Sequence, residues 1–89
     1  MGTWKEYMEQ GGDYIDDDSC KKAIEMFNKA LSLSKTNEEF AEAYYGRAFA
    51  SYENRDNAIA DYKMAADYGH KNAMEQLKKY GISYTPKKL

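Results

Sequence analysis

One helical pattern occurs twice between Lys22 and Ala66. Its apolar residues fall at positions i, i+1, i+4, i+7 and i+8, which a helix of 3.6 residues per turn places on one side. The small residues among them let a second helix approach closely, and the aromatic residue fills the remaining gap. The first copy is Ala23, Ile24, Phe27, Ala30 and Leu31, and the second, thirty-five residues later, is Ala58, Ile59, Tyr62, Ala65 and Ala66. Two amphipathic helices in tight packing are therefore predicted.

A second pair of matching segments precedes these two helices. Tyr7, Gly11 and Ile15 match Tyr44, Ala48 and Tyr52 at a spacing of thirty-seven residues. The difference of two residues from the other spacing fits into the turns, so the second hairpin has the shorter turn. The unit that repeats is therefore a helical hairpin.

Five helices are predicted from the apolar periodicity and from the residues that begin and end helices. They run from Thr3 to about Asp16, from about Ser19 to Leu33 or Ser34, from Thr36 to near Asn54, from Asp56 or Asn57 to about Tyr68, and from about Lys71 to Tyr80. Asp18 or Ser19 is expected to cap the second helix, and Thr36 with Glu39 forms a capping box for the third. Gly69 and Gly81 end the last two helices in the left-handed conformation.

The predicted first helix contains the pair Gly11 and Gly12, which costs about 1 kcal/mol per glycine relative to alanine. Either a second helix packs very closely at this point or the helix breaks at Gly11. The inner side of the third helix is predicted to carry Phe40, Ala43, Tyr44, Arg47, Ala48, Ser51 and Tyr52, and that of the fifth Ala73, Met74 and Leu77.

Size and charge exclude several classes of function. The 89 residues form one domain, and thirteen basic with fifteen acidic residues give a net charge of −2. Such a balance offers no basic field for nucleic acid. No apolar run approaches the roughly 20 residues that cross a bilayer, and no leader sequence is apparent, so we expect a cytoplasmic protein that does not enter membranes. Cys20 is the only cysteine, which excludes an internal disulfide and a thiolate metal cluster.

These hairpins resemble the tetratricopeptide repeat. The matching residues of the second copy are Ala41-Glu42-Ala43-Tyr44-Tyr45-Gly46-Arg47-Ala48 followed by Ala58, Tyr62 and Ala65, and those of the first are Tyr7, Gly11, Ala23, Phe27 and Ala30. The run from Tyr62 to Ala73, with Gly69 and His70, is similar to the related Sel1-like repeats. The resemblance covers residues 4–81, although the proline that commonly closes a repeat is missing from both copies.

The resemblance implies an all-α fold, namely an α-solenoid of two tetratricopeptide-like hairpins with a C-terminal capping helix. The first repeat would span about residues 3–35, the second about 37–69, and the capping helix about 71–80. Residues 82–89 would form a tail that is apolar at first and basic at its end. A capping helix covers the flank of the last hairpin, which would otherwise face water.

The resemblance also implies a protein interaction module that holds a peptide or a partner helix in a concave groove. The first helix of each repeat lines that groove, which assigns to it Lys5, Met8, Glu9, Gly12, Glu42, Tyr45, Phe49, Glu53, Glu75 and Lys78. Relatives that grip the C-terminal carboxylate of chaperones use five Lys, Asn or Arg side chains, whose positions here hold Met8, Gly12, Gly46, Glu75 and Lys79. Only Lys79 keeps the charge, so a peptide of mixed basic and apolar character suits the groove better.

Other interpretations remain open at the level of sequence. Tyr45 and Phe49 would instead only pack between helices, or exposed aromatic residues such as Trp4 or Tyr84 would hold a homodimer together. The chain would otherwise be one part of a larger scaffold protein. An enzyme is not expected, because the single histidine, His70, has no cysteine or acid placed near it by spacing, and Cys20 reads as a structural thiol. The sequence contains no phosphate-binding loop and no metal-ligand or cofactor motif.

Overall fold

Five α-helices form the chain in the computed structural model, which describes residues 2–88. They are α1 (Trp4–Asp16), α2 (Cys20–Leu33), α3 (Asn37–Ala50), α4 (Arg55–Asp67) and α5 (Lys71–Lys79). The described residues contain no β-strand, which confirms the prediction of an all-α fold. Leu89, part of the predicted tail, lies outside the described residues.

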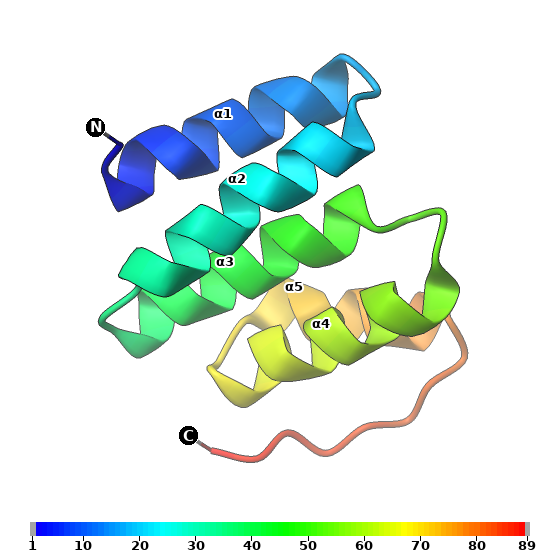
Figure 1. The fold of residues 1–89 in the computed structure, drawn as a ribbon. Coiled ribbons are helices and arrows are strands. Elements are labelled where there is room, and N and C mark those ends of the chain that lie inside the picture. Colours follow the sequence, from blue (N-terminus) through cyan, green and yellow to red (C-terminus); the bar gives the residue numbers. More distant parts are fainter. Residues whose placement is uncertain (1, 89) are drawn as a thin grey trace.

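The helices run back and forth, each antiparallel to the one before it (Figure 1). Each helix packs against the next one in the chain, and α1 also contacts α3. The molecule is flat as a result, with extents of 38 × 28 × 15 Å. Two separate groups of buried side chains hold this arrangement together.

The first group is centred on Phe27 of α2, which is 2 % exposed. Its ring lies between two glycines, since a Cβ added to Gly11 of α1 or to Gly46 of α3 would stand 2.6 or 2.4 Å from ring atoms. The helix α1 continues through Gly11 and Gly12, so the alternative of a helix break is wrong and that of a close approach at Gly11 is confirmed. Glycine is required where the ring fills the space that a side chain would take.

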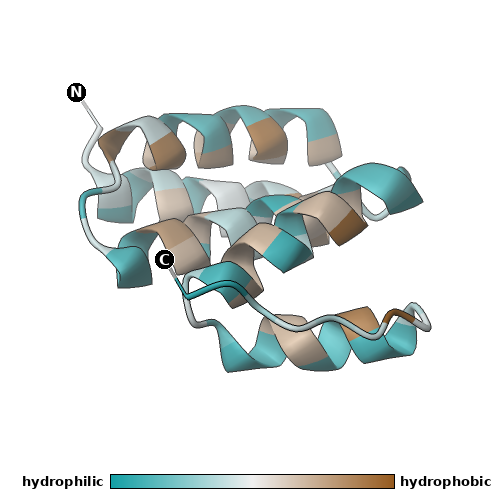
Figure 2. Cartoon of the chain, turned by 90° about the horizontal axis from the view of Figure 1, so that it is seen from below, coloured by the Kyte–Doolittle hydropathy of each residue, from teal (hydrophilic) through white to brown (hydrophobic). Residues whose placement is uncertain are grey.

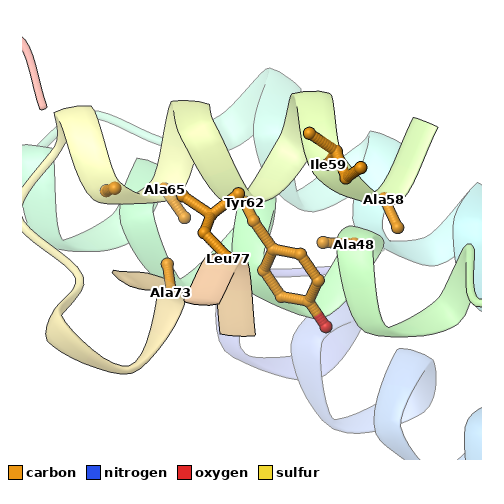
Figure 3. Close-up of a cluster of buried hydrophobic side chains, with 8 residues drawn as sticks. Ala48, Ala58, Ile59, Tyr62, Ala65, Ala73 and Leu77 are labelled. Carbon is orange, nitrogen blue, oxygen red and sulfur yellow. The ribbon is translucent and has the colours of Figure 1, made fainter. Parts of the chain in front are cut away.

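The second group joins α3, α4 and α5 around Tyr62 and Leu77 (Figure 3). Its other members are mostly alanines, which allow the helices to approach closely. They are Ala48, Ala58, Ile59, Ala65, Ala66 and Ala73. The predicted inward positions Ala73 and Leu77 of the fifth helix are both fully buried.

The loop between α3 and α4 differs from the prediction. The helix α3 ends at Ala50 and not near Asn54, and α4 begins at Arg55 and not at Asp56 or Asn57. The reason is a side-chain cap, because Asn54 Oδ1 accepts a hydrogen bond of 3.1 Å from the backbone N–H of Asn57. Tyr52 therefore lies in the loop and is 53 % exposed, so its predicted inward position is wrong.

Helix caps follow the predictions in part. Thr36 Oγ1 accepts from the N–H of Glu39 at 3.1 Å, but the Glu39 carboxylate accepts from the N–H of Lys35 at 2.8 Å. Only half of the predicted capping box is therefore formed. Ser19 is the N-cap residue of α2, one of the two predicted positions, but its side chain makes no capping hydrogen bond, and Asp18, with a φ of 58°, is not the cap. The left-handed glycines after α4 and α5 are confirmed, with φ of 101° at Gly69 and 77° at Gly81.

The tail returns along α5 toward the end at which that helix begins (Figure 2). Oδ1 of Asp67, a buried residue of α4, accepts hydrogen bonds from the Tyr84 hydroxyl at 2.8 Å and from the backbone N–H of Lys87 at 2.7 Å. Ile82 and Tyr84 pack against the second group of buried residues. Tyr84 is therefore half-buried, as is Trp4, and the expectation that both are exposed is wrong.

Candidate functional site

A row of side chains on one side of α3 is the first candidate for a functional surface. Glu42, Tyr45 and Phe49 stand at positions i, i+3 and i+7, which share a helix face. The ring centroids of Tyr45 and Phe49 are 6.4 Å apart, and Phe49 is 48 % exposed. We call Tyr45, Phe49 and the adjoining His70 the aromatic strip. An exposed large apolar side chain beside a second ring is the kind of surface that partner proteins bind.

Two neighbouring helices fix the position of Tyr45. Its ring meets Tyr62 of α4 edge to face, with centroids 5.6 Å apart. It stacks on His70 at 4.1 Å with an interplanar angle of 9°. His70 is the residue that precedes α5, so the strip is supported by α4 and by the start of α5. This rigid support lowers the entropic cost of binding a ligand.

An acidic residue borders the strip. Oε1 of Glu42 lies 3.3 Å from Nε2 of His70, and the Glu42 side chain is 56 % exposed while that of His70 is 10 % exposed. Sequence spacing placed no acid near His70, and Glu42 reaches it because it comes from a different helix. Cys20, the other candidate nucleophile of the sequence, interacts with Tyr52 and not with His70. Its hydrogen bond with the Tyr52 hydroxyl raises the pKa of that tyrosine.

Four of the remaining predicted groove residues lie on α1. Lys5 and Glu9 are exposed on α1, and Gly12 faces open space. Met8 is half-buried and packs against the group around Phe27, so part of its side chain belongs to the core.

Three further groove residues come from the second half of the chain. Glu53 is exposed, but it lies in the loop after α3 and not on the helix, because α3 ends at Ala50. Glu75 and Lys78 are exposed on α5, and Lys78 lines a cleft beside the tail. The ring contacts and the 3.3 Å approach of Glu42 to His70 therefore bring Glu42, Tyr45, Phe49 and His70 together. The other predicted groove residues lie on α1, on α5 or in the loop after α3.

A polar cleft of about 380 Å³ contains a group of interactions that the sequence did not reveal. The Arg47 guanidinium donates from Nε and Nη2 to the two oxygens of Asp61 at 2.9 and 2.8 Å, and from Nη1 to Asn28 at 2.8 Å. The bond to Asp61 raises the pKa of Arg47. These contacts link α2, α3 and α4, and all three guanidinium nitrogens of Arg47 donate to side chains of the other two helices, so we interpret the arrangement as structural.

Residues 2–88 contain neither a cluster of metal-ligating side chains nor a membrane-spanning helix. No group of three or more His, Cys, Asp or Glu side chains there is arranged to hold a metal ion. None of the helices in that range is both long and apolar enough to span a bilayer.

The chain was also compared with known proteins. No protein-family model, no curated protein and no solved structure matches it. The contacts of α3, α4 and α5 are therefore the basis for assigning a function to this chain.

Proposed function

We propose that this chain is a tetratricopeptide-like interaction module that binds a peptide or a partner helix. In this proposal α1 with α2 and α3 with α4 form two stacked hairpins of an α-solenoid, and α5 caps the second hairpin. The antiparallel order of the helices and the contact of α1 with α3 support it, since the first helices of successive repeats lie side by side in such stacks.

The observation that carries the proposal is the exposure of Phe49 beside a fixed Tyr45. Aromatic side chains bury a large area at small entropic cost, and they dominate the binding energy at protein interfaces. The Tyr45 ring is already held by Tyr62 and His70. A partner that covers Phe49 therefore gains apolar burial without first ordering this surface.

Charge indicates the chemistry of the partner. Two exposed carboxylates accompany α3, with Glu42 next to His70 of the strip and Glu53 in the loop that follows the helix. A Lys or Arg side chain would pair with these acids, and an Arg would also stack on the Phe49 ring. We therefore expect the partner segment to combine basic residues with apolar or aromatic ones.

Selection of a random peptide library on the immobilised protein tests this function. We expect enriched peptides to contain Lys or Arg near an apolar or aromatic residue. Phe49→Ala should weaken their binding by about tenfold or more, because hot-spot truncations cost about 2 kcal/mol. Tyr52→Ala is the matched control, because Tyr52 is similarly exposed, at 53 %, but contacts Cys20. Peptides that bind equally well to the Phe49→Ala variant would contradict the proposal.

A homodimer that buries Phe49 together with other exposed side chains is the alternative function. Leu33, Phe49 and Tyr52 are the large apolar or aromatic side chains most exposed to solvent in the described chain. Sedimentation at micromolar concentration separates the two functions. A monomer that binds the selected peptides supports the interaction module, whereas a dimer that Phe49→Ala dissociates would assign this surface to self-association.

A further inference from the structure

A mainly apolar cleft lies between the tail and the junction of α4 with α5. Its volume is about 470 Å³, within the range of roughly 300–1,000 Å³ that is usual for small-molecule sites. The walls are mainly apolar, with Ala66 and Tyr68 from the end of α4, Met74 from α5 and Pro86 from the tail. The cleft shares His70 with the aromatic strip, but Tyr45 and Phe49 do not line it.

The rim of this cleft is basic. Lys71 at the start of α5 and Lys87 and Lys88 of the tail all line it, and all three are exposed. The N-terminal end of α5 adds partial positive charge at the same place. Asp67 is the only carboxylate among the lining residues, and its Oδ1 already accepts from the Tyr84 hydroxyl and from the N–H of Lys87. The cleft therefore combines an apolar interior with an excess of positive charge at its edge.

We infer that this cleft binds a single-chain amphiphile with an anionic head, such as a medium-chain carboxylate. The hydrocarbon chain would lie against Ala66, Met74 and Pro86, where its burial is favourable. The carboxylate would stay at the rim and pair with the lysines. A neutral apolar molecule would form no ion pair with these lysines, and a cation would be repelled by them.

Titration of the isotope-labelled protein with decanoate, followed by amide NMR shifts, tests the inference. We expect decanoate to shift the amides of Ala66, Gly69, Met74 and the tail. Decanol, which has the same chain without the charge, should bind more weakly, and acetate, which has the charge without the chain, should not bind. Added salt should weaken the decanoate complex, because the paired lysines are exposed.

Paired variants then test the role of charge. Lys71→Gln with Lys87→Gln should weaken decanoate binding about five- to twentyfold at low salt, because exposed ion pairs contribute up to about 1 kcal/mol each. Lys21→Gln with Lys22→Gln is the matched control, since it removes the same charge from exposed positions at the start of α2. Equal weakening by both pairs would overturn the inference, as would equal binding of decanol, binding of acetate, or shifts confined to Tyr45 and Phe49.

Met74→Glu tests the apolar wall independently of the lysines. A carboxylate at this position would repel the head group and interrupt the apolar surface, so decanoate binding should be lost. The helical circular dichroism of the variant shows whether it is folded, and the two lysine pairs decide the outcome if it is not.

Discussion

The ring of Phe27 lies so close to Gly46 that a Cβ on that glycine would stand 2.4 Å from ring atom Cε1. The ring cannot move away, because Gly11 bounds its other side, with ring atom Cζ at 2.6 Å from a Cβ added there. One aromatic side chain of α2 thus fills the space left by glycines of α1 and α3.

Gly46→Ala is expected to destabilise the protein. Alanine improves helix propensity by about 1 kcal/mol, but the clash with a confined ring costs more, typically about 1–3 kcal/mol for an overpacked core. Denaturant unfolding measures the difference. Gly12→Ala is the control, since nothing lies within 4 Å of its added Cβ, and it should raise the free energy of unfolding by about 0.5–1 kcal/mol. If both variants were stabilised, the close contact with Phe27 would be refuted.

Arg47→Met should also destabilise the protein, because it leaves the buried Asp61 carboxylate without its partner. The Arg47 side chain keeps 29 % of its exposure, so we expect about 1–3 kcal/mol, below the loss for a fully buried pair. A double-mutant cycle with Asp61→Leu measures the coupling. The double variant should lose less than the sum of the single losses, and simple additivity would show that the two side chains do not interact.

Asp67→Ala should release the tail from α4. Both hydrogen bonds to Asp67 Oδ1 are lost, so the amide of Lys87 should exchange its hydrogen rapidly and trypsin should cleave the tail. The bond to Asp67 raises the pKa of the Tyr84 hydroxyl, and that pKa should fall in the variant. Asp13→Ala, which removes an exposed acid from α1, serves as the control. A Lys87 amide that stays protected in Asp67→Ala would show that other contacts hold the tail.

The protein should lose stability in alkaline solution through Tyr62. Burial, with smaller effects from Tyr80 and Tyr45, raises the pKa of the Tyr62 hydroxyl well above its ordinary value. The folded state therefore holds this proton more tightly than the unfolded chain, whose tyrosine pKa is about 10. The contribution is constant below about pH 10 and is lost as the pH rises further.

Tyr62→Phe isolates this contribution, because it keeps the ring and removes the ionisable group. Denaturant unfolding of both proteins at neutral pH and above pH 10 measures it. The wild-type chain should lose more stability between the two conditions than the variant. Identical losses would mean that Tyr62 does not ionise differently in the folded state.

Local signals in the sequence predicted most of the helices. The repeated stripe around Ala23 and Ala58 and the terminal glycines Gly69 and Gly81 define short-range preferences, which act within one or two turns. The end of α3 was predicted too late, near Asn54. In the structure Asn54 belongs to the next helix, because its side chain caps the start of α4. Asp18 is left-handed because it ends α1 and does not begin α2: the backbone N–H groups of Asp18 and Ser19 donate to the carbonyls of Ile15 and Tyr14.

The candidate surface was predictable only along one helix. The resemblance to the tetratricopeptide repeat assigned Glu42, Tyr45 and Phe49 to the groove, and in the structure the rings of Tyr45 and Phe49 lie 6.4 Å apart on α3. The stacking of His70 on Tyr45 and the binding of the tail to Asp67 depend on how distant segments meet. Pairings of that kind are determined by helix packing, which periodicity within a single helix does not encode.

The position of Phe27 affects how this small protein melts. A row of helices that touch only their neighbours along the chain unravels from its ends. Here α1, the first of the five helices, contacts the Phe27 ring together with α3. Unfolding of α1 would therefore expose one side of that ring and remove packing from α3 as well. Fraying of the first helix is thereby coupled to loss of the interior, and heating should give one cooperative transition.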